Sequence, residues 1–128
     1  TRVGKEFIIF NYDALEMYRS VYICEGALNA LTIGDRGIAT MGKAISGYQV
    51  NELLKSSCER FIILLDPDAK KYAINLALKL VAYKKVKVVF LPEGKDVNDL
   101  GRKETLRLVY QTRYQSYQDL IQIRNSLE

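Results

Sequence analysis

The chain has 128 residues, 48% of them hydrophobic, which is typical of a single globular domain and excludes a disordered chain. Its 19 Lys and Arg residues against 15 Asp and Glu residues give a net charge of +4, an excess too small to identify an anionic partner. Histidine is absent, which excludes Ser-His-Asp and Cys-His nucleophile systems and imidazole zinc sites, so any catalysis must use carboxylates, lysines or metal ions.

Short apolar runs and helical segments alternate in the first half of the chain. Residues 6–10 (EFIIF) and 21–24 (VYIC) are predicted strands, and residues 13–18 between them are predicted to form a short helix capped by Asp13. The next predicted elements are a helix over residues 26–33, a strand over residues 37–40, and a helix that follows its N-cap, Ser46, and ends near residue 56.

The strongest predicted strand lies in the second half, at residues 61–65 (FIILL), and ends at Asp66-Pro67-Asp68. Apolar residues recur at helical spacing over residues 69–83, and residues 85–91 (KVKVVFL) follow as another strand. A small helix over residues 96–100 precedes a long polar helix from Lys103 toward the end, with a break near Gln115 and Ser116 left open. Apolar strands separated by helices predict an α/β fold with a parallel sheet covered on both faces.

The last predicted helix carries several tyrosines, among them Tyr110, Tyr114 and Tyr117. They follow a helical stripe, which favours contacts with the core or a partner over a platform for stacking bases.

Cysteine content and hydropathy bear on location. Cys24 and Cys58 have no CxxC spacing, which is typical of a reducing cytoplasm, and Cys24 is predicted to be buried. The longest apolar run is far shorter than the roughly 20 residues that span a bilayer. We therefore predict a cytoplasmic protein without a membrane partner.

Acidic residues follow three of the predicted strands. Glu25 comes after the strand at residues 21–24, Asp66 and Asp68 come after residues 61–65, and Asp96 lies just beyond residues 85–91. Because the carboxyl ends of parallel strands meet at one edge of a sheet, these side chains are expected to converge. Each acid taken alone is equally compatible with capping a helix.

A cluster of carboxylates without histidine suits a hard cation such as Mg²⁺ or Mn²⁺, and phosphoryl transfer is the natural chemistry of such a site. Glu25 would be a metal ligand or a general acid or base. Lys43, Lys70, Lys71 and Lys95 lie at the same edge and are candidates for phosphate contacts, the alternative for each being an exposed, solvated charge.

Three segments in this order resemble the TOPRIM domain, which occurs in DNA primases, topoisomerases and several nucleases. They are Glu25-Gly26 after a strand, FIILLDPDA at residues 61–69, and LPEGKDVNDL at residues 91–100. The resemblance covers about residues 5–101. Residues 38–46 and 95–100 are most similar to primases, in the latter case to those of phages and mobile elements.

The resemblance implies a TOPRIM fold, with a mostly parallel sheet of about four strands flanked by helices. Residues 1–101 would form the catalytic domain, and residues 102–128 a helical extension that packs on it or links it to a neighbouring domain. By the same resemblance, Glu25, Asp66 and Asp68 would be catalytic and, with Asp96, would hold the metal. One departure is Asn29, where primases usually have Asp, which lowers the negative charge of the site.

The function implied by the resemblance is that of the catalytic domain of a DNA primase, a Mg²⁺-dependent nucleotidyltransferase that makes RNA primers. Its partners would be a single-stranded DNA template, nucleoside triphosphates and a replicative helicase. The alternatives are a TOPRIM nuclease and a non-catalytic module that binds nucleic acid or a helicase. A zinc-binding segment and a further polymerase subdomain are not visible in the sequence, so we expect a piece of a longer protein that needs other domains for full activity.

Overall fold

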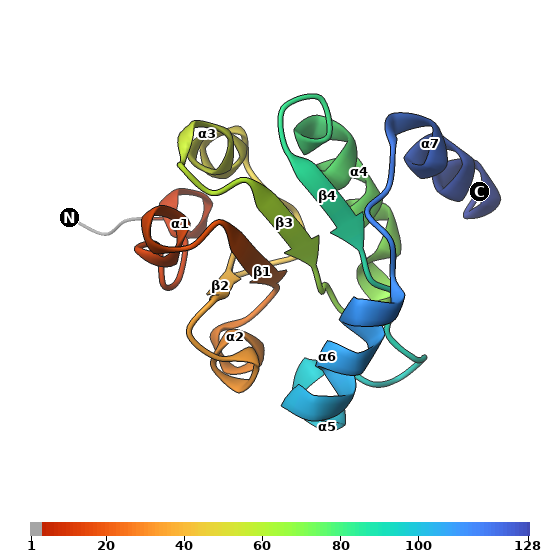
Figure 1. The fold of residues 1–128 in the computed structure, drawn as a ribbon, viewed down its shortest axis with the longest axis horizontal. Helices are drawn as coiled ribbons and strands as arrows, with labels where there is room; N and C mark the ends of the chain where they lie inside the picture. Colours follow the sequence, from red (N-terminus) through yellow and green to blue (C-terminus); the bar gives the residue numbers. More distant parts are fainter. Residues whose placement is uncertain (1–3) are drawn as a thin grey trace.

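The computed structural model describes residues 4–128 and contains a four-stranded sheet in the order β2-β1-β3-β4, in which neighbouring strands are parallel (Figure 1). This arrangement confirms the predicted fold class. The strands are β1 (Ser20–Cys24), β2 (Gly37–Ala39), β3 (Arg60–Ile63) and β4 (Lys85–Val88). The helices are η1 (Lys5–Phe7), α1 (Ala14–Met17), α2 (Ala27–Ile33), α3 (Gly47–Lys55), η2 (Pro67–Ala69), α4 (Lys70–Leu80), α5 (Val97–Leu100), α6 (Arg102–Gln111) and α7 (Tyr117–Ser126).

Helices cover both faces of the sheet (Figure 1), and buried apolar side chains pack on each face. Successive side chains of a strand point to opposite faces, so in β1 Val21 and Ile23 serve one core while Cys24 serves the other. Helices α1, α3, α4 and α7 cover the first face, and α2, α5 and α6 cover the second. The continuous apolar runs seen in the sequence are explained by this two-sided burial.

The predicted strand at residues 6–10 is wrong. Residues 5–7 form the 3-10 helix η1, and the pairing with the sheet is a single antiparallel bridge between Phe10 and Ala39. Two features limit the pairing: β2 is three residues long, and Asn11 turns the chain with a φ of 60°. The Asn11 side chain fixes this turn by donating hydrogen bonds to the carbonyl oxygens of Asp35 and Gly37.

The helix boundaries agree with the predictions in part. Ser46 caps α3 as predicted, because its hydroxyl accepts a hydrogen bond from the Gln49 amide while the Gln49 side chain accepts one from Ser46. Asp13 precedes α1, but its side chain makes no capping hydrogen bond, contrary to the prediction. The predicted helix at residues 69–83 is shorter and regular only over α4, and β3 ends at Ile63 although Leu65 is still buried.

The carboxyl-terminal segment forms two helices, so the break near Gln115 and Ser116 is confirmed. Gln115 lies against the free edge of β4: its backbone amide donates to the Val86 carbonyl at 3.0 Å, and its side chain accepts from the Val88 amide at 2.8 Å and donates to the Val88 carbonyl at 3.1 Å. The linker thereby covers the edge of the sheet, and α7 packs against α4.

The helical stripe of tyrosines does not lie in the core. Tyr110, Tyr114 and Tyr117 are 77%, 38% and 58% exposed, whereas Val109 and Leu120 are buried. The sequence analysis placed these tyrosines on one helical stripe that runs from Lys103 toward the end of the chain. Because the helix breaks after Gln111, the face that packs changes from α6 to α7.

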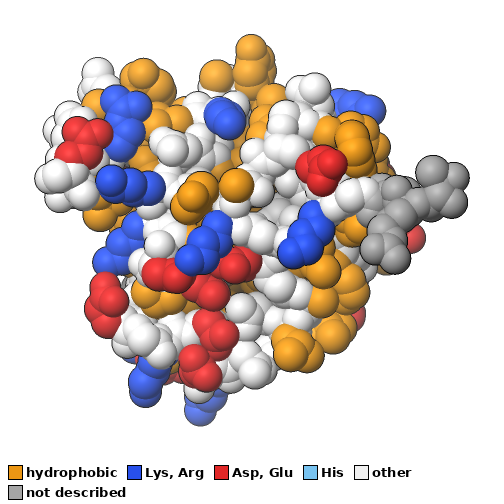
Figure 2. Space-filling model, turned by 180° about the vertical axis from the view of Figure 1, so that it is seen from behind, with side chains coloured by type: hydrophobic (Ala, Val, Ile, Leu, Met, Phe, Trp, Pro, Cys, Tyr) orange, Lys and Arg blue, Asp and Glu red, His pale blue; other side chains and the backbone are white. Residues whose placement is uncertain are grey.

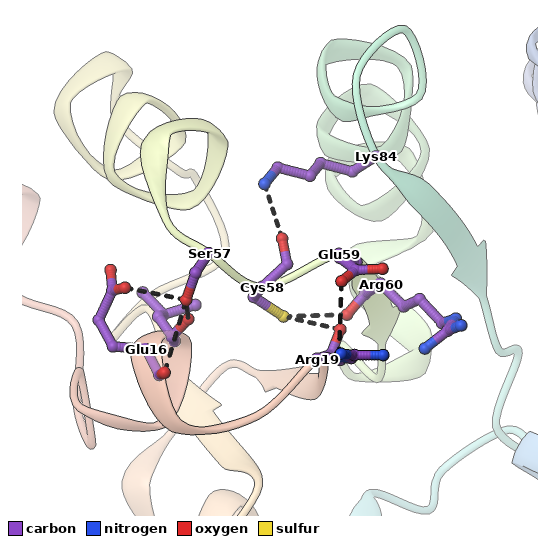
Figure 3. A network of polar contacts seen from close by, with 8 residues as sticks. Glu16, Arg19, Ser57, Cys58, Glu59, Arg60 and Lys84 are labelled. Atoms are coloured by element: carbon purple, nitrogen blue, oxygen red, sulfur yellow. Dashed lines mark hydrogen bonds and ion pairs between the residues drawn. The ribbon is translucent and has the colours of Figure 1, made fainter.

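The amino-terminal edge of the sheet is held by a polar network in front of β1 and β3 (Figure 3). Lys84 donates hydrogen bonds to the carbonyl oxygens of Ser56 and Cys58, and the Cys58 thiol contacts the Arg19 carbonyl at 3.3 Å. Ser57 donates to the Glu16 carboxylate. The loop before β3 is therefore fixed from both sides.

Among the described residues, no helix has both the length and the apolar character that crossing a bilayer requires.

Candidate metal centre

Three carboxylates converge at the carboxyl ends of β1 and β3. Glu25 follows β1, Asp66 follows the end of β3, and Asp68 lies in the 3-10 turn η2. One oxygen atom from each lies within 4.8 Å of the others. Asp66 and Asp68 are joined by a turn, in which the Ala69 amide donates to the Asp66 carbonyl at 2.8 Å.

The electrostatics of this cluster disfavour its charged state in the absence of a cation. Burial is the main cause that raises the pKa of Glu25, and the neighbouring Asp66 adds to it. Burial also raises the pKa of Asp66, followed by the charges of Asp96 and Asp68. Carboxylates held this close repel one another, and a positive charge between them would relieve the repulsion.

The donor set fits a hard divalent cation. All three residues offer carboxylate oxygens, which Mg²⁺ and Mn²⁺ prefer. Within residues 4–128, the Oε1 atom of Glu25 is buried and has no hydrogen-bond partner. A buried oxygen without a partner is costly, and a cation would satisfy it.

Lys43 is the basic residue that the structure brings to the cluster. Its Nζ atom lies 2.5 Å from Oδ2 of Asp68, and this hydrogen bond raises the pKa of Lys43. The loop that carries it is fixed at two adjacent residues: the Met41 amide donates to the Glu25 carbonyl at 2.8 Å, and the Gln49 side chain donates to the Thr40 carbonyl at 2.8 Å.

Asn29 is a member of the site whose role the sequence did not reveal. It is 7% exposed, its Nδ2 atom lies 3.4 Å from Oδ1 of Asp66, and its Oδ1 atom accepts a hydrogen bond of 3.0 Å from the Asn98 amide. The second bond fixes the orientation of the amide, so that the donor faces Asp66. One buried side chain thus connects the acid cluster to the start of α5.

Asp96 lies beside the cluster rather than within it. Its Oδ1 atom accepts from the Asp99 amide at 2.8 Å, and the Asp99 side chain accepts from Asp96 in return, a capping box at the start of α5. Both residues line a cavity of about 390 Å³ next to Asp66 and Asp68. Glu93, which sequence reasoning did not single out, also lines it.

The other three predicted phosphate ligands differ in position. Lys95 lines the acidic cavity, whereas Lys70 pairs with Glu93 at 3.3 Å and lies 5.8 Å from the centre of the Phe90 ring. Lys71 is exposed on α4 and does not line the cavity. Figure 2 shows the acidic side chains gathered in one area of this face, with basic side chains beside them.

The sequence and the fold both resemble known proteins. The sequence model of the Toprim-like family matches residues 22–101. A DNA primase of Lactococcus lactis subsp. lactis (strain IL1403) is 27% identical over 116 residues, which cover 84% of this chain and 18% of that protein.

Two solved structures have the same fold. The E. coli primase catalytic core matches with a TM-score of 0.72 and 17% identity, over 98% of this chain and 44% of that one. A DnaG primase catalytic domain bound to ssDNA matches with a TM-score of 0.70 and 18% identity, over 92% of this chain and 43% of that one. The chain therefore spans less than half the length of these relatives. Since the matched residues make up more than half of the chain, it belongs to the Toprim-like family.

Proposed function

We propose that this chain is the TOPRIM segment of a DNA primase and that it performs divalent-metal-dependent nucleotidyl transfer. The observation that carries the proposal is the placement of carboxylate oxygens from Glu25, Asp66 and Asp68 within 4.8 Å of one another. The DNA primase of Lactococcus lactis, which shares 27% identity with this chain, supports primer synthesis as the reaction.

Asp66 and Asp68 would hold Mg²⁺ or Mn²⁺, with Glu25 as a third ligand and Asp96 close by. A cation held there supplies positive charge beside the reacting phosphate. In the reaction, the 3′ oxygen of the primer attacks the α-phosphorus of a nucleoside triphosphate, and the bond to diphosphate breaks. The alternative role for Glu25 is that of a general base, which would accept the proton of the attacking hydroxyl.

The lysines would handle the phosphates. Lys43 is paired with Asp68, and a cation on Asp68 would free its ammonium group for the triphosphate. Lys95 lines the acidic cavity formed with Asp66, Asp68 and Asp96. Lys70 is neutralised by Glu93 and Lys71 lies outside the cavity, so we assign weaker phosphate contacts to these two residues.

We further propose a single-stranded DNA template, nucleoside triphosphates and a replicative helicase as partners, and a phage or mobile element as the source. The resemblance of residues 95–100 to primases of phages and mobile elements supports the source. The similarity to a DnaG primase catalytic domain bound to ssDNA supports the template. A cytoplasmic location stays a prediction from the cysteine pattern.

The metal site is tested by calorimetric titration with Mn²⁺ of the native chain and of the Asp66→Asn, Asp68→Asn double variant. We expect saturable binding to the native chain and none to the double variant. A matched control is the Asp13→Asn, Asp35→Asn double variant, which removes two exposed carboxylates away from the cluster and should bind as the native chain does. Absence of binding to the native chain would favour the non-catalytic module.

The reaction is tested in a longer protein that contains this segment, by incubating it with template, nucleoside triphosphates and Mg²⁺ and separating the products by size. Extension products that disappear in the Asp66→Asn variant support nucleotidyl transfer. Cleavage products from the template, lost in the same variant, would assign the acids to a nuclease, since there water replaces the hydroxyl as nucleophile.

A further inference from the structure

A second polar cavity, of about 420 Å³, lies away from the acid cluster. It opens between α6, the end of α2 and the turns that precede β1 and β2. Tyr22 of β1 is one of its lining residues. Tyr22 comes three residues before Glu25, so about 10 Å of strand separates the backbones of these two residues. We call it the tyrosine–arginine cavity, and its lining residues are Tyr18, Tyr22, Ile33, Asp35, Arg36, Arg102, Leu106 and Tyr110.

Two tyrosine rings in this cavity are available for contact. Tyr22 is half-buried, and within residues 4–128 its hydroxyl makes no hydrogen bond. Tyr110 is 77% exposed. Arg102, Leu106 and Tyr110 are spaced four residues apart, so they share one face of α6 and form one wall of the cavity. Because the Tyr110 ring is so exposed, it contributes little to the stability of the domain, but it offers an aromatic surface to a ligand.

Two guanidinium groups face the same space without acidic partners among the described residues. The Cζ atom of Arg36 lies 4.9 Å from the centre of the Tyr18 ring. Arg102 is oriented by one hydrogen bond of 3.0 Å from its Nε atom to the Ile33 carbonyl, which leaves its terminal nitrogens free to donate. Asp35 is the acidic side chain of the lining and forms no ion pair with either arginine.

Two further basic residues, Arg60 and Lys85, lie on the same face of the sheet as Tyr22. Tyr22 pairs in register with Ile62, Arg60 lies two residues before Ile62, and Arg60 pairs with Lys85. Lys87 shares this face but is buried, and it donates hydrogen bonds to the Val109 and Thr112 carbonyl oxygens, so it does not add to the exposed charge. Figure 3 shows the Arg60 side chain directed away from the ion pair of Arg19 and Glu59.

We propose that the tyrosine–arginine cavity binds single-stranded nucleic acid, with a base stacked on Tyr110 and Tyr22 and a phosphate held by Arg36 and Arg102. Single strands expose both the faces of their bases and their phosphates, and exposed rings next to cations match this combination. Duplex DNA keeps its bases stacked inside, so it would use the arginines without the rings. The binding needs no metal and does not rest on the proposed nucleotidyl transfer.

The test is fluorescence anisotropy of a labelled short thymidine oligonucleotide with the full chain in EDTA, at several salt concentrations. Tyr110→Ala should weaken binding by about fivefold or more, with the salt dependence unchanged. Arg36→Gln should reduce the slope of log affinity against log salt by about 0.7, the value for one lost phosphate contact on a single strand. Tyr110→Phe should bind as the native chain does, because it keeps the ring.

Matched controls lie on α7, which packs against α4 on the other side of the sheet. Tyr117→Ala and Arg124→Gln remove an exposed tyrosine and an exposed arginine there and should leave both affinity and salt slope unchanged. Equal losses in the control and cavity variants, or no binding by the native chain, would overturn the proposal. The Asp66→Asn, Asp68→Asn variant should retain oligonucleotide binding, so failure of the metal chemistry and failure of this cavity are distinguishable.

Discussion

At the scale of single residues, the acid cluster lowers the stability of the fold when no cation is present. The pKa of Asp66 is raised in the folded state, first by burial and then by Asp96 and Asp68. Between the ordinary carboxyl pKa and this raised value, the native state binds more protons than the unfolded state, so stability falls as the pH rises. The penalty is present above the raised pKa of Asp66, and it is lost as the pH falls through that pKa toward the ordinary carboxyl value of about 4.

Asp66→Asn should therefore melt at a higher temperature than the native chain at pH 7 in EDTA, because it removes one of the repelling charges. The difference should shrink on acidification to about pH 4, where the native carboxyl is itself protonated. Adding Mn²⁺ should raise the melting temperature of the native chain and leave that of the variant unchanged. Thermal melts followed by circular dichroism check all three results, and a variant less stable than the native chain at pH 7 contradicts the argument.

Asn29 tests the geometry of the same site without removing an acid. In Asn29→Asp, the new carboxylate can still accept from the Asn98 amide, but its other oxygen faces Oδ1 of Asp66 where a donor stood before. We expect a loss of about 1–3 kcal/mol of stability in EDTA, the usual cost of a lost hydrogen bond to a charged group. Mn²⁺ should then stabilise the variant more than it stabilises the native chain, because the added charge also attracts the cation.

The measurement is the shift in melting temperature on adding Mn²⁺, compared among the native chain, Asn29→Asp and Asn29→Leu. Asn29→Leu keeps the volume of the side chain and loses both hydrogen bonds, so it should lose stability without gaining extra response to Mn²⁺. An identical Mn²⁺ response in Asn29→Asp and Asn29→Leu would show that Asn29 is merely a packing residue.

At the scale of elements, the linker between α6 and α7 protects an edge that would otherwise be open. Gln115 satisfies the Val88 amide and carbonyl with its side chain. Gln115→Ala should cost about 1–3 kcal/mol, since two hydrogen bonds at a sheet edge are lost. Hydrogen exchange should accelerate at the β4 amides. Gln118→Ala, an exposed glutamine on α7, is the control and should change neither quantity.

The strands and the acid cluster were predictable because each depends on a short stretch of sequence. An apolar run followed by an acid specifies a buried strand and a carboxylate at its carboxyl end, and two such stretches place Glu25, Asp66 and Asp68 together. Residues 6–10 have a similar apolar run but no strand, because their partner β2 is too short to pair with them. The length of a partner elsewhere in the chain cannot be read from the run itself.

The parts of the sites that escaped prediction depend on contacts between distant residues. Asn29 and Asp66 are 37 positions apart in the sequence. No local sequence pattern shows that the side-chain amide of Asn29 donates to the carboxylate of Asp66. Tyr110 was assigned to an apolar stripe, and its exposure follows from the place where the chain leaves α6 to cover β4. The contact between the linker and the edge of β4 is a tertiary contact. It ends α6 early, so Tyr110 does not lie on the face that packs against the core, as the sequence pattern alone suggested.

At the scale of the whole molecule, the two charged regions lie on different parts of one rigid sheet. The acids gather at the carboxyl ends of the strands, and the tyrosine–arginine cavity lies toward their amino-terminal ends on the side of α2 and α6. Because the acids repel phosphate without a cation, a nucleic acid should approach the cavity first in EDTA and the cluster only when a divalent cation is present.

This chain corresponds to only part of the length of its relatives, which bears on whether it can make primers without other domains. It corresponds to 18% of the Lactococcus lactis primase and 44% of the E. coli catalytic core. A polymerising site must hold template, primer end and triphosphate together, and the two regions proposed above would supply only a cation site and one contact for a strand. We therefore expect the isolated chain to bind Mn²⁺ and oligonucleotide but to make no primers from labelled nucleoside triphosphates on a single-stranded template. Template-directed products from the chain alone, lost in Asp66→Asn, would contradict this expectation and assign the whole reaction to these 128 residues.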